Sequence, residues 1–513
     1  MLQKLIFEKA KQLSNNHICI LSAENTFNDF TSKNLSAMNN LFKITTFILI
    51  IVSSSNKITG QNCNNMNIQW KSDISSTCNF MIMTMIHDDL NRPYLYVANK
   101  EAGLKIYDIS VITSPLLIAT VPTNLFATLD VMNVSQSGNY LYLALGNTFT
   151  NPQQGGMAIV DIANPLLPVV TDYYLVPSST SGGGIIKVEG DYAYLGAMKN
   201  GLVILDITNK SNIQFASQFV PNINYPPIAN PNPDYYNARG MEVKNSIVYL
   251  CYDGGGFRII NCTNKLSPME TGRWCNPAVY TPLDHPKAYN NIILDDTLVY
   301  IAVDYCGMEI LNIADTSNIT LTGWWNPYNC PNNNWFNTPV HSNEIQYNKD
   351  CKQIFLSTGK SDMMVVDVSN PALPDSCNFY GGVTNNLGTW GVGLYQNEIY
   401  LSYICSVVPF ASNWTGVKIL TYTSCPLGIE ESNDFGFSVY PNPAQDELKI
   451  ETPIYLNNAE LIIFNSLGQP VKKISKMNGD SFTIENMELS NGLYFIVLTN
   501  ENKQVTSKLL IDQ

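Results

Sequence analysis

The chain has 513 residues, of which 14% are charged, and its formal net charge is −13 at pH 7. This acidic balance argues against nucleic acid as a partner, because phosphates are bound by Lys and Arg. Acidity is also common in secreted proteins, so it selects no other partner. The length suits one large closed fold followed by a small domain.

Residues 1–60 are predicted to form a leader. Residues 1–37 show no clear pattern, whereas the basic start Met38–Lys43 precedes the short apolar run Ile44–Val52. This order, followed by small residues, is typical of a secretory signal peptide. The run is about half the ~20 residues that a membrane-spanning helix needs. We therefore predict translation from Met38, cleavage after Gly60 and no transmembrane span in the mature chain. An uncleaved amphipathic leader is the alternative.

A short motif, as in Gly201-Leu-Val-Ile-Leu-Asp206, recurs seven times after the leader. Its copies begin at Gly103, Gly156, Gly201, Gly256, Gly307, Asp362 and Gly416. A second run with a central aromatic residue precedes each copy, and turns such as Asp253-Gly-Gly-Gly256 join the two runs. The β-branched and aromatic residues of both runs predict strands.

Two more strands complete each copy. Pro165 and similar residues end the motif strand, because proline cannot continue a hydrogen-bonded ladder. A third strand follows, such as Gln214–Val220, and a fourth, such as Gly184–Val188, precedes the aromatic run. Four strands in a period of about fifty residues are the signature of a β-propeller. The sequence therefore predicts an all-β fold with a seven-bladed β-propeller at 61–425. A β-solenoid or an open sandwich is the alternative.

The segments Gly201–Ile207 and Gly156–Pro165 resemble the LVIVD repeat of bacterial surface propellers. The resemblance covers roughly Met66 to Cys425 and implies the fold, without a shared catalytic motif. Asn261, Asn312 and Thr421 replace the motif Asp in three copies. We therefore interpret the Asp positions as turn caps, with a metal-binding ring as the alternative.

The N-terminal run Ile68–Asp73 matches the outer strands of later copies, whereas the seventh copy ends at Lys418–Tyr422 without one. We predict that the N-terminal strand completes the last blade and closes the ring, which removes open sheet edges.

Eleven of the twelve cysteines follow the predicted leader. Export permits disulfides, and the odd number predicts at least one free thiol. No CxxC or Cys/His pattern typical of zinc occurs, so we predict no metal and no cofactor.

The long loops are expected on one face of the propeller, because strand directions alternate within a blade. They are 146–155, 221–237, 276–288, 326–340 and 405–416. Insertions on one face are typical of the binding face of repeat proteins. Their aromatic and Asn residues suit glycan or peptide surfaces. Packing of these rings onto the blades is the alternative.

Candidate ligand-binding residues lie in these loops or near the starts of the inner strands, where they could line the channel mouth. They are Arg239, Asn290, Trp335, His341, Glu344, Trp390 and Trp414. A His and a Glu suit acid–base chemistry, yet no catalytic motif accompanies them, so we assign no catalytic residue. We predict a binding protein for a glycan or protein ligand. A secreted hydrolase or lyase acting on polysaccharide is the alternative.

After a polar linker at 426–436, short strands and Gly turns at 437–513 predict a small Ig-like β-sandwich. Its motifs resemble the C-terminal sorting domain of type IX secretion. The residues are Tyr440, Pro441, Asn442, Pro443, Gly468, Gly492, Tyr494 and Lys508. The resemblance implies a Bacteroidota-type route: Sec export to the periplasm, then the type IX secretion machinery as a partner. The product would be secreted or attached to the outer-membrane surface. An accessory binding module is the alternative.

Overall fold

The computed structural model describes residues 66–149, 151–280, 288–330, 339–382, 386–405, 412–423, 437–485, 488–500 and 503–512. The predicted leader, with Met38 and Gly60, lies outside the described residues, as do the linker at 426–436 and the candidate Trp335. The described residues are predominantly β-strand, so the all-β prediction is confirmed.

Seven antiparallel sheets of four strands each are present in the described part of the chain. The first three comprise β2 (Thr84–His87), β3 (Tyr94–Ala98), β4 (Leu104–Asp108), β5 (Leu116–Val121); β6 (Val131–Ser137), β7 (Tyr140–Leu145), β8 (Gly156–Asp161), β9 (Val169–Leu175); and β10 (Ile185–Glu189), β11 (Tyr192–Gly196), β12 (Leu202–Asp206), β13 (Gln214–Phe219). The next two comprise β14 (Met241–Lys244), β15 (Ile247–Cys251), β16 (Phe257–Asn261), β17 (Met269–Trp274); and β18 (Tyr289–Asp295), β19 (Leu298–Val303), β20 (Met308–Asn312), β21 (Thr320–Trp325).

The last two comprise β22 (Ile345–Asn348), β23 (Gln353–Ser357), β24 (Met363–Asp367), β25 (Asp375–Tyr380); and β26 (Thr389–Tyr395), β27 (Glu398–Tyr403), β28 (Thr415–Tyr422), β1 (Ile68–Ser76). Short helical turns lie between strands at η2 (Thr123–Phe126), η3 (Pro233–Tyr235), α3 (Pro277–Tyr280) and η4 (Asp304–Cys306).

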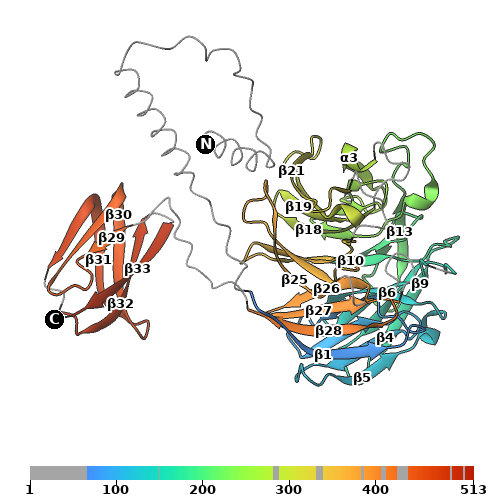
Figure 1. Ribbon diagram of the computed structural model, residues 1–513, viewed down its shortest axis with the longest axis horizontal. Helices are drawn as coiled ribbons and strands as arrows, with labels where there is room; N and C mark the ends of the chain where they lie inside the picture. The colour runs from blue at the N-terminus through green and yellow to red at the C-terminus, as the bar shows by residue number, and fades with distance from the viewer. Residues whose placement is uncertain are drawn as a thin grey trace, which may run out of the picture. The chain divides into compact units, whose positions relative to one another are not determined.

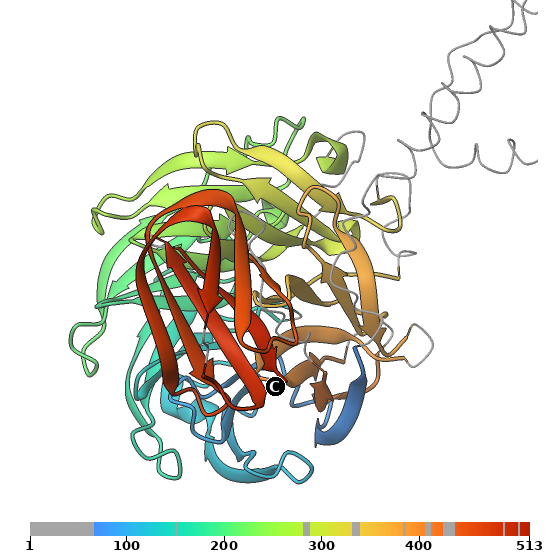
Figure 2. The same ribbon diagram turned by 90° about the vertical axis from the view of Figure 1, so that its left-hand side faces the viewer.

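The seven sheets form a β-propeller. The strands β2, β6, β10, β14, β18, β22 and β26 lie side by side in this order, and β26 lies beside β2. The sheets therefore surround a central axis, as Figure 2 shows. The predicted N-terminal clasp is confirmed, because β1 pairs with β28 from Ile68 to Ser76. In Figure 1 the blue strand β1 lies beside the orange strand β28.

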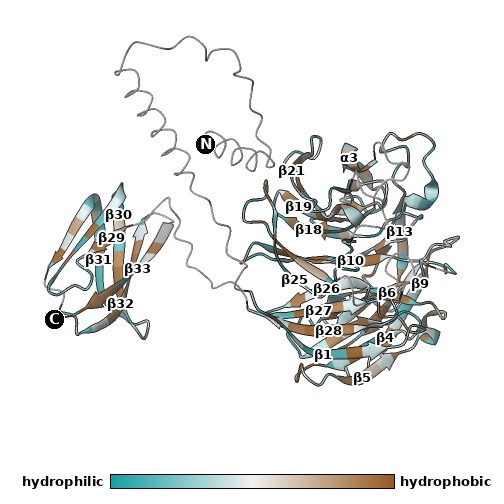
Figure 3. Ribbon diagram, viewed as in Figure 1, coloured by the Kyte–Doolittle hydropathy of each residue, from teal (hydrophilic) through white to brown (hydrophobic). Residues whose placement is uncertain are grey.

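The core of the propeller lies between neighbouring sheets. The central aromatic residue of the second strand is buried in six copies, namely at Tyr96, Tyr142, Tyr194, Tyr300, Phe355 and Tyr400. Between the second and third sheets, for example, Tyr142 and Ile159 pack with Leu195 and Val203. Hydrophobic residues accordingly concentrate on the strands in Figure 3. Each sheet covers the apolar face of the next, which a single sheet could not do alone.

The polar residue that ends the motif strand caps the following turn. Asp206 Oδ1 accepts the Thr208 N–H at 2.9 Å, and Asn261 Oδ1 accepts the Thr263 N–H at 2.9 Å. The same contact occurs at Asp108, Asp161, Asn312 and Asp367. Asn and Asp serve equally in this role, so the capping interpretation is confirmed. Among the described residues, no group of three His, Cys, Asp or Glu is placed to bind a metal.

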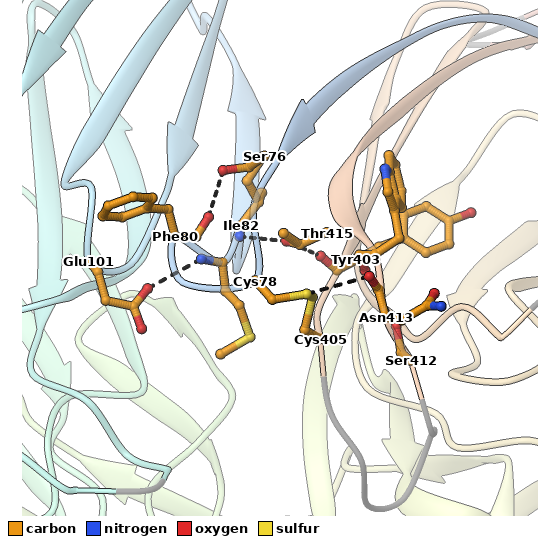
Figure 4. Close-up of a disulfide and its surroundings, with 12 residues drawn as sticks. Ser76, Cys78, Phe80, Ile82, Glu101, Tyr403, Cys405, Ser412, Asn413 and Thr415 are labelled. Atoms are coloured by element: carbon orange, nitrogen blue, oxygen red, sulfur yellow. Dashed lines mark hydrogen bonds between the residues drawn. A yellow bond between two sulfur atoms is a disulfide. The ribbon is translucent and has the colours of Figure 1, made fainter.

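A disulfide closes the seam of the ring. It joins Cys78, which follows β1, to Cys405, which follows β27 (Figure 4). Beside it, Thr415 Oγ1 accepts the Ile82 N–H at 2.9 Å and donates to the Tyr403 carbonyl at 2.6 Å. The clasp is thus hydrogen-bonded along β28 and covalently fixed at its end.

The remaining described cysteines divide into bonded and free. Cys306 and Cys330 form a second disulfide, and Cys351 and Cys377 are also disulfide-bonded. Free thiols are buried at Cys251, Cys262 and Cys275, so the prediction of at least one free thiol is confirmed.

The described part of the C-terminal domain has five strands: β29 (Ser438–Tyr440), β30 (Glu447–Asn465), β31 (Pro470–Glu485), β32 (Gly492–Asn500) and β33 (Lys503–Ile511). Strand β30 pairs with β29, β31 and β32 within one hydrogen-bonded sheet. Register shifts between Glu451 and Ala459 mark bulges that bend β30. Alternate residues such as Leu448, Ile450 and Leu461 point into one shared core.

Candidate functional site

The propeller channel opens into a cavity of about 340 Å³. Each of the seven sheets contributes a lining residue at or just before the start of its innermost strand. These residues are Met83, Met132, Gly184, Arg239, Asn290, Glu344 and Trp390. Phe149, Tyr235 and Ala288 from the long loops complete part of the lining. The cavity therefore lies on the face that carries the long loops.

One wall of the cavity is apolar. Met83 and Met132 form a small buried cluster against which Phe149 and Trp390 pack. The rings of Phe149 and Trp390 meet edge to face, with centroids 5.4 Å apart. The guanidinium of Arg239 lies 5.5 Å from the centroid of the Trp390 ring, within the range of a cation–π contact. Trp390 is therefore held between an apolar and a cationic neighbour.

The remaining lining residues are mostly polar and include carboxylates. His341 Nε2 lies 2.6 Å from Asp304 Oδ1, and the rings of Tyr305 and His341 meet edge to face. Asn237 Nδ2 donates to Asp253 Oδ2 at 2.8 Å. These contacts hold an imidazole and two carboxyl groups in fixed orientations at the channel mouth.

Two carboxyl groups of the cavity titrate near neutrality. Burial raises the pKa of Glu344 to about 7, although a hydrogen bond donated by Asn291 opposes the change. Burial likewise raises the pKa of Asp253 to about 6, against the nearby charge of Arg239 and the bond from Asn237. In both cases desolvation of the charged form outweighs the favourable contacts.

The structure brings five of the seven candidate residues together. Arg239, Asn290, His341, Glu344 and Trp390 all line this cavity. Trp414 lies elsewhere: its ring packs against Tyr403, and the Lys418 ammonium lies 4.8 Å from its centroid. Trp335 lies outside the described residues.

Sequence reasoning did not single out Asp253, Asp304 or Phe149, which also line the cavity. The sequence pattern places Asp253 only in a hairpin turn between the second and third strands of its sheet. Such turns open on the same face as the long loops, so an acidic residue in one of them was the available signal.

Comparison with known protein families supports both resemblances that the sequence motifs indicate. A model described as the LVIVD repeat matches residues 92–123, 130–176, 184–220 and 355–379. A model described as the secretion system C-terminal sorting domain matches residues 438–512. The chain carries LVIVD repeats and a secretion system C-terminal sorting domain. Both sequence-based resemblances are therefore confirmed, and together they indicate a secreted or cell-surface propeller protein exported by type IX secretion.

Solved structures similar to this LVIVD propeller chain have low sequence identity to it. Saccharomyces cerevisiae Sqt1 aligns with a TM-score of 0.47 at 9% identity, over 75% of this chain and 95% of that one. The WD40 beta propeller domain of Doa1 aligns with a TM-score of 0.44 at 8% identity, over 69% and 97%. The computationally designed Ika8 protein gives 0.42 at 9% identity, over 86% and 100%. No curated protein matches the sequence.

The motif residues of the sorting domain mostly hold its own fold. Asn442 Nδ2 donates to the Lys508 carbonyl at 2.9 Å, and Asn442 Oδ1 accepts the Leu510 N–H at 2.9 Å. Tyr494 OH donates to the Ser490 carbonyl at 2.9 Å. Gly468 has a φ of +75° and closes the turn between β30 and β31. The motif Tyr440-Pro441-Asn442-Pro443 is thus tied to the last strand.

Among the described residues, no helix has the length and hydrophobicity to span a membrane.

Proposed function

We propose that this exported propeller is a binding protein, and that the cavity at the channel mouth holds part of a glycan or protein ligand. The observation that carries the proposal is the convergence of lining residues from all seven sheets on one cavity. A concave site with an aromatic wall and a few oriented polar groups is typical of ligand binding. The sorting domain supports a ligand outside the cell or on its surface.

Trp390 gives the most direct test, because its ring joins the apolar wall to Arg239. We expect Trp390→Ala to weaken binding to ligands found on glycan and peptide arrays by about tenfold or more, as for a central aromatic residue of an interface. The matched control is Trp70→Ala, since Trp70 lies on β1 with 54% of its surface exposed. Array signals that Trp390→Ala leaves unchanged would place the binding site elsewhere.

One observation favours the enzyme alternative. His341 and Asp304 form a close pair, and the pKa of Glu344 is raised to about 7, which suits acid–base chemistry near neutral pH. If the protein cleaves polysaccharide, incubation with array-positive glycans would release shorter oligosaccharides, which mass spectrometry detects. Glu344→Gln would then abolish release. Intact glycans after incubation with the wild-type protein contradict an enzymatic function.

A further inference from the structure

We propose that the cavity at the channel mouth binds the cationic side chain of a protein ligand, a lysine or an arginine. The inference rests on the proposed binding function and names the chemical class of the ligand. Its charged head would face the carboxyl groups of Asp253, Asp304 and Glu344, and its aliphatic stem would lie against the methionines and aromatic rings.

The charges of the cavity favour a cation. Three carboxyl groups line it, whereas Arg239 is the one Lys or Arg among the described lining residues. The guanidinium of Arg239 lies on the Trp390 ring, and its charge also acts on Asp253 and Glu344, so this single cation offsets only part of the negative charge of the three carboxylates. Deeper in the channel, Lys187 is paired with Glu242 at 2.8 Å and adds no net charge. A desolvated carboxylate interacts strongly with an incoming ammonium or guanidinium group.

Two buried amide oxygens are an independent indication of a hydrogen-bond donor. Asn290 and Asn343 are 5% and 3% exposed and both line the cavity. Asn290 Nδ2 donates to the Ser342 carbonyl at 2.7 Å, and Asn343 Nδ2 donates to the His341 carbonyl at 3.3 Å. The Oδ1 atoms of both residues lack a hydrogen-bond partner among the described residues. A buried acceptor without a donor is unfavourable, and ammonium and guanidinium groups carry donors only.

The division of the cavity into an apolar and a polar wall favours a basic side chain over an amino sugar. Lysine and arginine have a hydrocarbon stem that ends in a charged head. Met83, Met132 and Phe149 offer surfaces for such a stem, and methionine adapts well to flexible chains. A sugar has no such hydrocarbon stem, so any of its hydroxyl groups directed at these side chains would lack hydrogen-bond partners.

The titration of the carboxyl groups links cation binding to proton release. Burial raises the pKa of Glu344 to about 7 and that of Asp253 to about 6. The other charged or titratable groups around them include Arg239, Asp304, His341, Tyr235, Cys251, Lys187 and Glu242. A bound cation stabilises the ionised carboxylates, so affinity should rise between pH 5.5 and pH 8.

The test is isothermal titration calorimetry of the full chain with acetylated and amidated tripeptides. Gly-Arg-Gly and Gly-Lys-Gly are the cationic probes, and the same peptides with citrulline or norleucine are the uncharged controls. We expect the uncharged peptides to bind at least about tenfold more weakly, as for the loss of a charge-assisted hydrogen bond. Heats measured in buffers of different ionisation enthalpy should show proton release near pH 6.5.

Two variants are tested, so that a folding defect in one of them does not decide the outcome. Asp253→Asn and Glu344→Gln should each weaken the cationic probes by about tenfold, with circular dichroism confirming the fold. Glu447→Gln is the matched control, because Glu447 is exposed on β30 of the sorting domain. Equal binding of the charged and uncharged peptides would overturn the inference. Tighter binding of glucosamine than of Gly-Lys-Gly would assign the site to amino sugars.

The outcomes separate this inference from the proposed function. If the cationic probes fail to bind while Trp390→Ala still weakens array signals, the cavity is a binding site for a different chemical class. If Trp390→Ala leaves array signals unchanged, the proposed location of the binding site is itself wrong.

Discussion

Glu309 on β20 is an ionisable residue placed inside the propeller. Its side chain is fully buried and accepts hydrogen bonds from Trp274 Nε1 and Tyr289 OH, both at 2.9 Å. Burial nevertheless raises the pKa of Glu309 to about 7. The folded protein therefore keeps this proton over a pH range in which the unfolded chain has released it. The free energy of unfolding should thus fall as pH rises from about 4.5 to 7, then level off.

Glu309→Gln removes this titration while keeping an oxygen that can accept both bonds. We expect urea unfolding, followed by circular dichroism, to show a smaller loss of stability between pH 5 and pH 8. The difference from the wild type should be roughly 2–3 kcal/mol, from the shift of the pKa. Asp253 and Glu344 titrate with the same sign in both proteins and cancel in the comparison. If Glu309→Gln leaves the pH dependence of the free energy of unfolding unchanged, burial does not raise the pKa of Glu309.

Residues with local roles could be predicted from the sequence, whereas residues with long-range roles could not. Asp206 caps a turn two residues away, and that spacing is visible in the motif. Arg239, His341 and Glu344 were found because they precede inner strands on the face of the long loops. Asp253 contributes to the site only because ring closure brings its turn beside those residues, and no local pattern records this.

The clasp strand β1 shows how the elements hold the ring together. Ile74 is 5% exposed and packs with Val417, Ile419 and Val97, whereas Trp70 on the same strand is largely exposed. We expect Ile74→Ala to cost about 2–4 kcal/mol of stability, because it leaves a cavity between the last and first sheets. Trp70→Ala should cost much less. Equal losses in thermal or urea unfolding would contradict the packing of β1 across this seam.

Element boundaries were predictable where strands are short and repeated. The absence of an outer strand after the seventh copy, together with a matching run at Ile68, was enough to predict the clasp. In the C-terminal domain the strands are longer than the short strands expected from the sequence, since β30 continues through its bend as a single strand. Bulges permit this continuation, and the alternation of apolar residues alone does not distinguish a bent strand from two strands.

Closure of the whole ring depends on contacts between the two ends of the propeller. The Cys78–Cys405 disulfide joins residues 327 apart in sequence, whereas the Cys306–Cys330 disulfide joins residues 24 apart. Connectivity could not be predicted, because eleven cysteines allow many pairings and only the closed ring brings these two together. Export to an oxidising compartment allows the bridge to form.

The two disulfides permit a matched comparison at the scale of the molecule. A cross-link restricts the unfolded chain more when it closes a longer loop. We therefore expect Cys78→Ser with Cys405→Ser to lower the free energy of unfolding by about 2 kcal/mol more than Cys306→Ser with Cys330→Ser. Urea unfolding under oxidising conditions measures both. The seam variant should also bind ligand more weakly, because Ile404, next to Cys405, packs with Met83 and Met132 of the apolar wall. An equal or reversed order of stability would mean that the hydrogen-bonded clasp alone determines closure.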